Sequence, residues 1–150
     1  MDSSLAPSEQ SIPLHTGALT ARQIDLLLTH LPLDVTYVDA GNIVRFYSET
    51  KDRTFPRTPA VVGRSVLQCH PPSSVHRVKR ILDDFRDGLR DAAEFWIQLK
   101  GDATESRFIH IRYFAVRDSA GAFQGTIEVT QDVTGIRKLD GERRLLAEGE

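Results

Sequence analysis

The chain has one cysteine and one methionine in 150 residues, and both scarcities exclude kinds of site. A single thiol, Cys69, cannot form an internal disulfide bond, which agrees with a reducing compartment. Met1 is the only methionine, so no methionine of a folded core is available as a metal ligand.

Long apolar runs are also missing. Charged residues interrupt every apolar stretch well before the ~18 residues that a membrane-spanning helix needs. The N-terminus lacks the basic start and apolar run of a signal peptide. The formal net charge is -2, so nothing global points to nucleic acid. We therefore expect a cytoplasmic protein with no membrane partner and no direct nucleic-acid contact.

Recognisable catalytic motifs are absent as well. The sequence has no nucleophile motif, no phosphate-binding glycine loop, and neither the HExxH nor the CxxC spacing of metal sites. We therefore expect that the protein is not an enzyme. An enzyme acting on a small bound molecule would need a titratable group with a strongly shifted pKa in a cavity.

The composition divides the chain into three parts. Residues 1–17 are rich in serine and proline and poor in large apolar groups, which predicts a flexible arm outside the fold. Residues 18–134 have the length and apolar content of a single domain. Residues 135–150 place leucines among charges and predict a helix that leaves the domain.

Helical spacing occurs in two segments of the domain. Thr20 and Gln23 have the spacing of a capping box, which predicts a short amphipathic helix after them. A longer helix is expected from Ser73 or Ser74 to Gly88. Its apolar positions, spaced three and four apart, are Val75, Val78, Leu82, Phe85 and Leu89.

Five segments rich in β-branched and aromatic residues predict strands. They cover residues 34–37, 43–47, 93–99, 107–116 and 123–131. Strands at both ends of a helical middle predict an α+β domain in which one antiparallel sheet carries the helices on one face. The proline-rich residues 48–72 are expected to be irregular and to form a wall of any ligand pocket.

Three stretches, taken in order, resemble the PAS domain family. They are Leu-Pro-Leu-Asp-Val-Thr-Tyr-Val-Asp at 31–39, Val-Gly-Arg-Ser-Val at 62–66 before His-Pro-Pro at 70–72, and Gly-Thr-Ile-Glu-Val-Thr-Gln-Asp-Val-Thr at 125–134. The similarity covers roughly residues 23–146 and departs at Ser48, where many members carry asparagine. It implies a PAS fold: a five-stranded antiparallel sheet with helices over one face around a small cavity, and a C-terminal signalling helix.

Four shorter motifs resemble a narrower PAS subgroup. They are Cys69-His70-Pro71-Pro72, Ser74-Val75-His76, Phe95-Trp96 and His110-x-Arg112-Tyr113-Phe114. Members of this subgroup occur alone, beside hemerythrin-like domains, or in haem-containing regulators that respond to carbon monoxide. The resemblance implies haem as a candidate cofactor, gas or redox sensing, and coupling to an output or transcription-regulatory domain.

The same resemblance makes His76 the first candidate ligand of a haem iron, because haem-bearing PAS domains carry a histidine on the long middle helix. His70 and Cys69 are further candidates for cofactor binding. Plainer interpretations stay open: a regular helix turns His76 away from the apolar stripe, and His70 can hydrogen-bond loop backbone. Cys69 can be an inert buried thiol. A zinc site from these three residues is disfavoured, because adjacent residues rarely point at one metal.

The expected strand at 107–116 has two different faces. Alternation places His110 and Arg112 on one face, and Ile109 and Tyr113 on the other. The pattern does not decide which face lines the cavity. Either Arg112 or Arg64 could clamp the carboxylate of a small organic acid.

The leading hypothesis is a signal-sensing PAS domain. A ligand or haem in the cavity would shift the sheet and the exit helix between two arrangements, and the change would pass to a partner or to an output domain beyond this chain. We expect a homodimer. The alternatives are a haem-free dimerisation or interaction module and a sensor of a small organic ligand.

Overall fold

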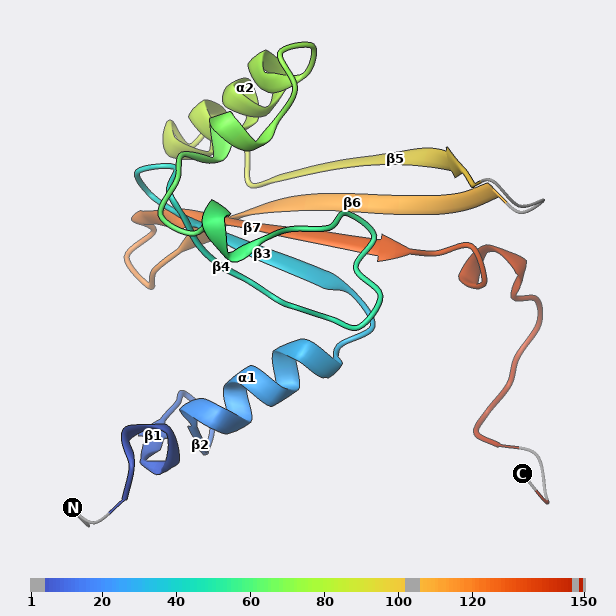
Figure 1. The fold of residues 1–150 in the computed structure, drawn as a ribbon, viewed down its shortest axis with the longest axis horizontal. Coiled ribbons are helices and arrows are strands. Elements are labelled where there is room, and N and C mark those ends of the chain that lie inside the picture. The colour runs from blue at the N-terminus through green and yellow to red at the C-terminus, as the bar shows by residue number, and fades with distance from the viewer. Residues whose placement is uncertain (1–4, 102–105, 147–148, 150) are drawn as a thin grey trace.

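The computed structural model describes residues 5–101, 106–146 and 149. Five strands form one antiparallel sheet in the order β4-β3-β7-β6-β5 (Figure 1). They are β3 (Asp34–Asp39), β4 (Val44–Tyr47), β5 (Ala92–Lys100), β6 (Ser106–Arg117) and β7 (Phe123–Asp132). The first and last of these strands pair in the middle of the sheet, and the predicted α+β class is confirmed.

Alternation along the strands gives the sheet an inner and an outer face. Ile109, Ile111 and Tyr113 of β6 are at most 6% exposed and belong to the core. His110 and Arg112 therefore lie on the outer face, away from the core. This settles the question that the sequence pattern left open.

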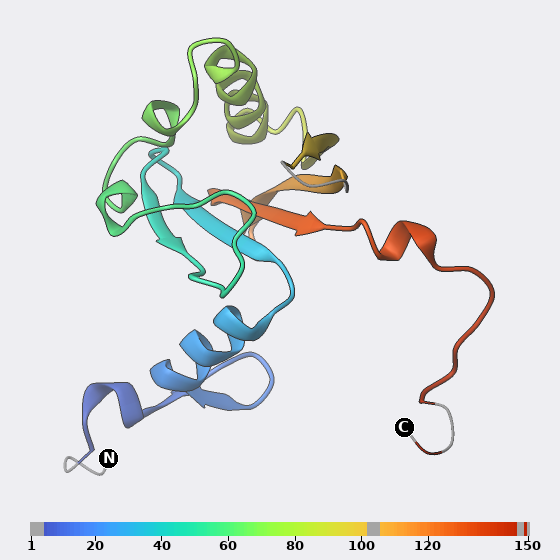
Figure 2. The ribbon, with the colours of Figure 1, turned by 45° about the vertical axis from the view of Figure 1, so that its right-hand side comes forward.

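The inner face is covered by α2 (Val75–Arg86), which lies above the sheet in Figures 1 and 2. Val78 and Leu82 pack in one cluster with Val38 of β3, and Phe85 packs in a second cluster with β6. The helix ends before Gly88, whose φ of 72° suits glycine and closes the last turn. The predicted start, stripe and end of this helix are confirmed, except that Leu89 lies beyond it.

The segment from Ser48 to Pro72 is irregular, as its prolines predict. It contains only two short 3-10 helices, η2 (Pro59–Val61) and η3 (Val66–Cys69). Val66 of η3 is 3% exposed and joins the cluster around Val78, which ties the segment to the inner face.

The N-terminal part contains more structure than its composition predicts. Residues 5–17, expected to be a flexible arm, include η1 (Pro7–Glu9) and strand β1 (Ser11–Pro13), which pairs with β2 (Ala18–Thr20). Gly17, with φ 81°, permits the turn between these strands. Helix α1 (Ala21–His30) follows, and its capping box between Thr20 and Gln23 is confirmed by both hydrogen bonds.

The exit helix expected over 135–150 is not present in the described residues of that segment. A single 3-10 turn, η4 (Ile136–Lys138), is followed by irregular chain with positive φ at Gly141 and Leu145. A short isolated helix is marginal in water, and Leu139 is 77% exposed, so no packing supports a helix here. Across the described residues, no helix is long and apolar enough to cross a membrane.

Candidate functional site

The interior of the domain contains a small cavity between the sheet and α2. Its polar walls are Tyr113 on β6, Thr126 and Glu128 on β7, and His70 just after η3. Its apolar walls are Val38, Val66, Val78 and Leu82. The open volume is about 10 Å³, which is the room that one water molecule needs. We call this space the core cavity.

Three buried polar atoms in and beside the core cavity have no hydrogen-bond partner among the described residues, and two of them belong to side chains that line it. They are Nε2 of His70, Oγ1 of Thr126 and Nε of Arg57. Buried polar atoms nearly always find a partner, and leaving one unpaired costs about 1–3 kcal/mol. The site therefore offers unused hydrogen-bonding capacity to a molecule from outside the chain.

An ion pair forms one side of this site. Arg57 reaches from the loop after β4 to Glu128, with Nη2 3.6 Å from Oε2 and each side chain 12% exposed. Burial raises the pKa of Glu128, and the Arg57 guanidinium opposes that rise. The pair brings one positive and one negative group together, so the site has little net charge.

The other two titratable side chains in the cavity wall, His70 and Tyr113, are neutral near pH 7. Burial, with a further contribution from the Arg57 charge, lowers the pKa of His70. Burial and the charge of Glu128 raise the pKa of Tyr113 well above its usual range. A neutral imidazole has one donor and one acceptor nitrogen, and a phenol can donate or accept.

The loop that carries Arg57 is fastened to the sheet by side chains. Arg53 donates from Nη1 to the carbonyl of Ser48 at 3.1 Å and lies over the Tyr47 ring. Asp34 accepts from Thr50 Oγ1 at 2.6 Å and from the Thr54 amide at 2.8 Å. These contacts hold the loop, and with it Arg57, against the inner face.

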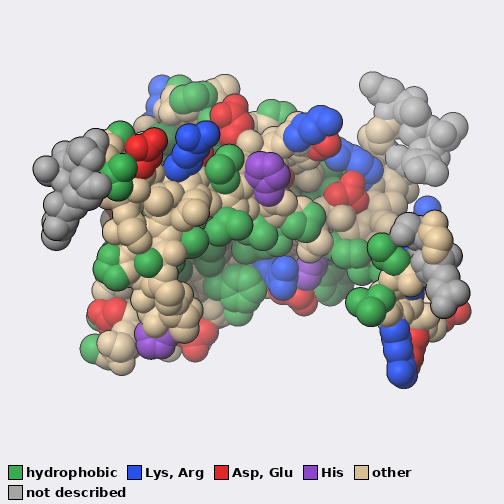
Figure 3. Space-filling view, turned by 90° about the horizontal axis from the view of Figure 1, so that it is seen from below, with side chains coloured by type: hydrophobic (Ala, Val, Ile, Leu, Met, Phe, Trp, Pro, Cys, Tyr) green, Lys and Arg blue, Asp and Glu red, His purple; other side chains and the backbone are tan. Residues whose placement is uncertain are grey.

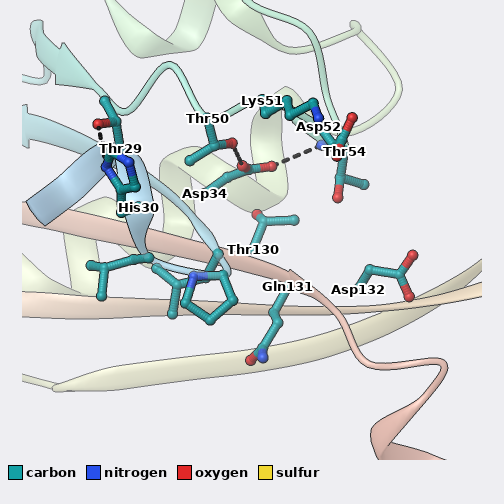
Figure 4. A pocket seen from close by; sticks show the side chains of 13 residues that line it. Thr29, His30, Asp34, Thr50, Lys51, Asp52, Thr54, Thr130, Gln131 and Asp132 are labelled. Carbon is teal, nitrogen blue, oxygen red and sulfur yellow. Dashed lines mark hydrogen bonds between the residues drawn. The ribbon is translucent and has the colours of Figure 1, made fainter. Parts of the chain in front are cut away.

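A larger groove of about 320 Å³ is lined in part by residues of this loop (Figure 4). It is bounded by the end of α1, the start of β3, the loop at 50–54 and the end of β7. Asp34 lies in its wall with both oxygens used by Thr50 and Thr54, as the dashed lines in Figure 4 show. The groove is open to solvent, and no unpaired buried atom identified in the described residues lies in its wall.

The candidate residues predicted from sequence are found in different places. His70 lines the core cavity. Cys69 packs against the cluster around Val78, and its Sγ lies 3.8 Å from the carbonyl oxygen of Ser65. His76 is exposed on the first turn of α2 and does not line the cavity. Among the described residues, no group of three histidine, cysteine or acidic side chains could hold a metal ion.

The two arginines expected to clamp an organic acid also lie elsewhere. Arg112 is on the outer face of the sheet, and Arg64 is exposed on the surface. Arg57, which the sequence reasoning did not select, is the arginine beside the cavity. Glu128 was the feature of the sequence that could have indicated a buried basic residue, because an acidic side chain that points into the core from a strand needs a partner of opposite charge.

A haem does not fit the core cavity of this structure. Pockets for ligands of drug size have roughly 300 Å³ or more, whereas this cavity has about 10 Å³. The first candidate for the iron ligand, His76, lies outside it.

Comparisons with known proteins agree with this fold. The sequence model of the PAS domain family matches residues 24–134. A C-terminal domain from Streptococcus mutans is 37% identical, with 89% of this chain and 99% of that chain covered and a TM-score of 0.81. No curated protein matches the chain.

Two more distant structures share the fold. A sensory box sensor histidine kinase from Vibrio cholerae is 16% identical over 76% of this chain and 91% of that chain, with a TM-score of 0.53. The VqmA dimer from Vibrio cholerae is 18% identical over 88% of this chain and 59% of that chain, with a TM-score of 0.54. The matched sequence, the five-stranded sheet and the covered inner cavity lead to one conclusion: the chain belongs to the PAS family of sensory and signalling domains.

Proposed function

We propose that this PAS domain senses a small, neutral, polar molecule in the core cavity and is a binding module, not an enzyme. The supporting observation is a set of unpaired buried atoms: His70 Nε2 and Thr126 Oγ1 on the cavity wall, and Nε of Arg57, the ion-pair partner of the wall residue Glu128. A ligand with at least one donor and one acceptor would satisfy groups that otherwise cost stability.

The charges and the size of the site favour a neutral, compact ligand. Arg57 and Glu128 already balance each other, and a net charge added to a buried site carries a large desolvation cost. The cavity has about 10 Å³, so only a molecule of a few heavy atoms can enter with a modest outward shift of α2.

Signalling would follow from the walls of the cavity. Thr126 and Glu128 belong to β7, and β7 leads directly into the exit segment after Asp132. A ligand that binds one arrangement of β7 more tightly shifts the population toward it. We propose that the exit segment transmits this shift to an output domain, that the chain acts as a homodimer, and that it does so in the cytoplasm.

A second candidate function has its own support in the structure. The near closure of the core cavity suits a ligand-free interaction module, in which His70 and Thr126 serve only the fold. Haem and carbon monoxide sensing, which the subgroup resemblance implies, have no such support, because the cavity has no room for a macrocycle.

Calorimetric titration with acetamide and acetate tests the first proposal, since these probes match in size and differ in charge. We expect acetamide to bind with a dissociation constant in roughly the millimolar range, as befits four heavy atoms. We expect acetate not to bind. Thr126→Val should abolish acetamide binding, and Thr58→Val, at an exposed hydroxyl, should leave it intact.

The same preparation separates the alternatives. Binding of neither probe, together with a Thr126→Val protein that is as stable as the parent, would favour the ligand-free module. A visible absorption spectrum of protein expressed in cells supplied with haem tests whether the domain binds haem. A stoichiometric Soret band that is lost in His70→Ala would contradict our exclusion of haem.

A further inference from the structure

The open groove of about 320 Å³ at the end of α1 differs from the core cavity in its charge. Its walls include three carboxylates, those of Asp34, Asp52 and Asp132, and one ammonium group, that of Lys51. Figure 3 shows acidic and basic side chains interspersed over the face of the molecule that is seen from below. The groove departs from that mixed pattern, because negative charge prevails among the side chains that line it.

Two buried polar side chains lie next to each other in the wall of the groove. Asp34 on β3 and Thr130 on β7 are register partners, and they are 5% and 4% exposed. Figure 4 shows the Thr130 side chain on β7 below Asp34. The Thr130 hydroxyl borders the groove and has no hydrogen-bond partner among the described residues. Polar side chains in such buried positions normally have a partner, so this hydroxyl points to a molecule from outside the chain.

The acceptors of this pair are only partly used. Asp34 accepts one hydrogen bond at each oxygen, from Thr50 Oγ1 at 2.6 Å and from the Thr54 amide at 2.8 Å. A carboxylate has about four acceptor positions, so about two remain, and a hydroxyl oxygen offers two more. An ammonium group brings three donors and no acceptor, which matches a wall of this kind.

The remaining walls suit the rest of an amine. Leu31, Pro32 and Leu33 supply apolar surface to the groove. His30 Nδ1 lies 2.7 Å from the carbonyl oxygen of Leu26, so Nδ1 carries the hydrogen and Nε2 of the neutral ring is a further acceptor. The volume of about 320 Å³ admits a ligand of several heavy atoms without any movement of the chain.

We propose that the groove binds a small aliphatic amine. The ammonium group donates to the Asp34 carboxylate and to the Thr130 hydroxyl, and the hydrocarbon stem lies against Leu31, Pro32 and Leu33. Hydrogen bonds between an ammonium group and a carboxylate are among the strong ones in proteins, and the burial of Asp34 reduces their screening by salt. This site for an organic cation goes beyond the proposed function, which places a neutral molecule in the core cavity, and it does not depend on that cavity.

Calorimetric titration of the complete chain with butylammonium, 1-butanol and butyrate tests the proposal, because these probes share a four-carbon chain and differ in charge. We expect butylammonium to bind with a dissociation constant of about 1 mM and 1-butanol at least about tenfold more weakly. Butyrate should not bind. Equal affinity for butylammonium and 1-butanol overturns the recognition of positive charge, and no binding of butylammonium at about 10 mM overturns the site itself.

Two substitutions test the position of the ammonium group. Thr130→Val keeps the shape of the side chain, removes the hydroxyl, and should raise the dissociation constant of butylammonium about tenfold. Thr58→Val, at an exposed hydroxyl outside the groove, is the matched control and should have no effect. Asp34→Asn should raise the dissociation constant at least about tenfold, whereas Asp87→Asn, at the exposed C-terminal end of α2, should leave it unchanged.

The Thr130→Val result decides the proposal even if Asp34→Asn fails to fold, since Asp34 also fastens the loop at 50–54. A Thr130→Val protein that binds butylammonium as tightly as wild type rules out the predicted position of the ammonium group. A lysine side chain carries the same head group and stem, so Nα-acetyl-lysine methylamide distinguishes the two sources. Binding about tenfold tighter than that of butylammonium replaces the small amine with a lysine-bearing peptide, and equal or weaker binding supports the small amine.

Amide chemical shifts of the unmodified chain locate the site directly. Butylammonium should shift the resonances of His30, Asp34 and Thr130 and leave those of Val78 and Leu82, in the wall of the core cavity, unchanged. Shifts confined to the core cavity contradict the assignment of the amine to the groove. Acetamide remains the probe of the core cavity, so failure of the groove site and failure of the proposed function are distinguishable.

Discussion

Tyr113 on β6 and Glu128 on β7 are register partners, and both side chains face the core cavity. The pair places a phenol and a carboxyl group side by side in the interior, with Arg57 3.6 Å from the carboxyl oxygen. Such buried groups make the sheet interior of this domain polar at one point, and they make its stability depend on pH.

Glu128 should lower the stability of the domain as pH rises. Its pKa in the folded state is raised by burial above the ordinary value of 4.5, so the folded protein binds the proton more tightly than the unfolded chain does. The resulting stability is complete below about pH 4.5 and is lost as pH rises through the folded pKa.

Urea denaturation of wild type and Glu128→Gln across this range measures the effect. The free energy of unfolding of wild type, relative to the variant, should fall with rising pH, because glutamine does not titrate. Asp39 and Asp132 have lowered pKa values, so their contributions to stability change with pH in the opposite direction. These contributions are the same in wild type and variant and cancel in the difference between the two free energies of unfolding. A difference that rises with pH would show that Arg57 controls the ionisation of Glu128 more strongly than burial does.

Phe85→Ala should destabilise the domain by about 3–5 kcal/mol, because the ring is fully buried between α2 and β6 and its loss leaves a cavity. Leu89→Ala, four residues later and 76% exposed, should change the free energy of unfolding by less than about 0.5 kcal/mol. Urea denaturation of both variants measures the contrast. Equal costs would contradict the observed end of α2.

The sequence predicted most of the fold because local signals matched the packing. The capping box at Thr20 and Gln23 begins α1, and the stripe of Val78, Leu82 and Phe85 is the face that α2 buries. The described residues of the predicted exit helix form a 3-10 turn and irregular chain, and there is a physical reason for this. Spacing of leucines predicts an amphipathic helix only where another surface covers them, and Leu145 is 90% exposed.

The site was less predictable because it joins distant segments. His70 was selected as a candidate and does line the core cavity. Arg57 comes from an irregular loop, and no periodic pattern assigns an inward direction to a loop residue. The family resemblance favours His76 as a ligand, but α2 is regular from its first turn and leaves His76 exposed. A regular helix turns this position away from the apolar stripe, as its spacing in the sequence indicates.

Gly125→Ala should destabilise the domain by at least about 2 kcal/mol. Gly125 has φ 149°, and a Cβ atom there would collide with the carbonyl oxygen of Val38 on the adjacent strand. Gly121→Ala is the control: its φ is 82°, but no atom lies within 4 Å of the added Cβ, so only backbone strain of about 1 kcal/mol is expected. Thermal unfolding of both variants gives the comparison, and equal losses would mean that strain, not the contact with β3, decides the cost.

Thr134→Val should loosen the start of the exit segment without unfolding the domain. Thr134 Oγ1 accepts from the Phe108 amide at 2.8 Å and donates to Asp132 Oδ1 at 2.5 Å, so one hydroxyl joins the end of β7 to β6. Valine has the same shape and neither interaction, and the loss should be about 1 kcal/mol. Amide hydrogen exchange should accelerate at Phe108 and in the residues after Asp132, while exchange at Ile111 stays at the wild-type rate. Faster exchange throughout β6 would instead show that this hydroxyl stabilises the sheet as a whole. It would contradict the prediction that the hydroxyl acts locally, on the start of the exit segment.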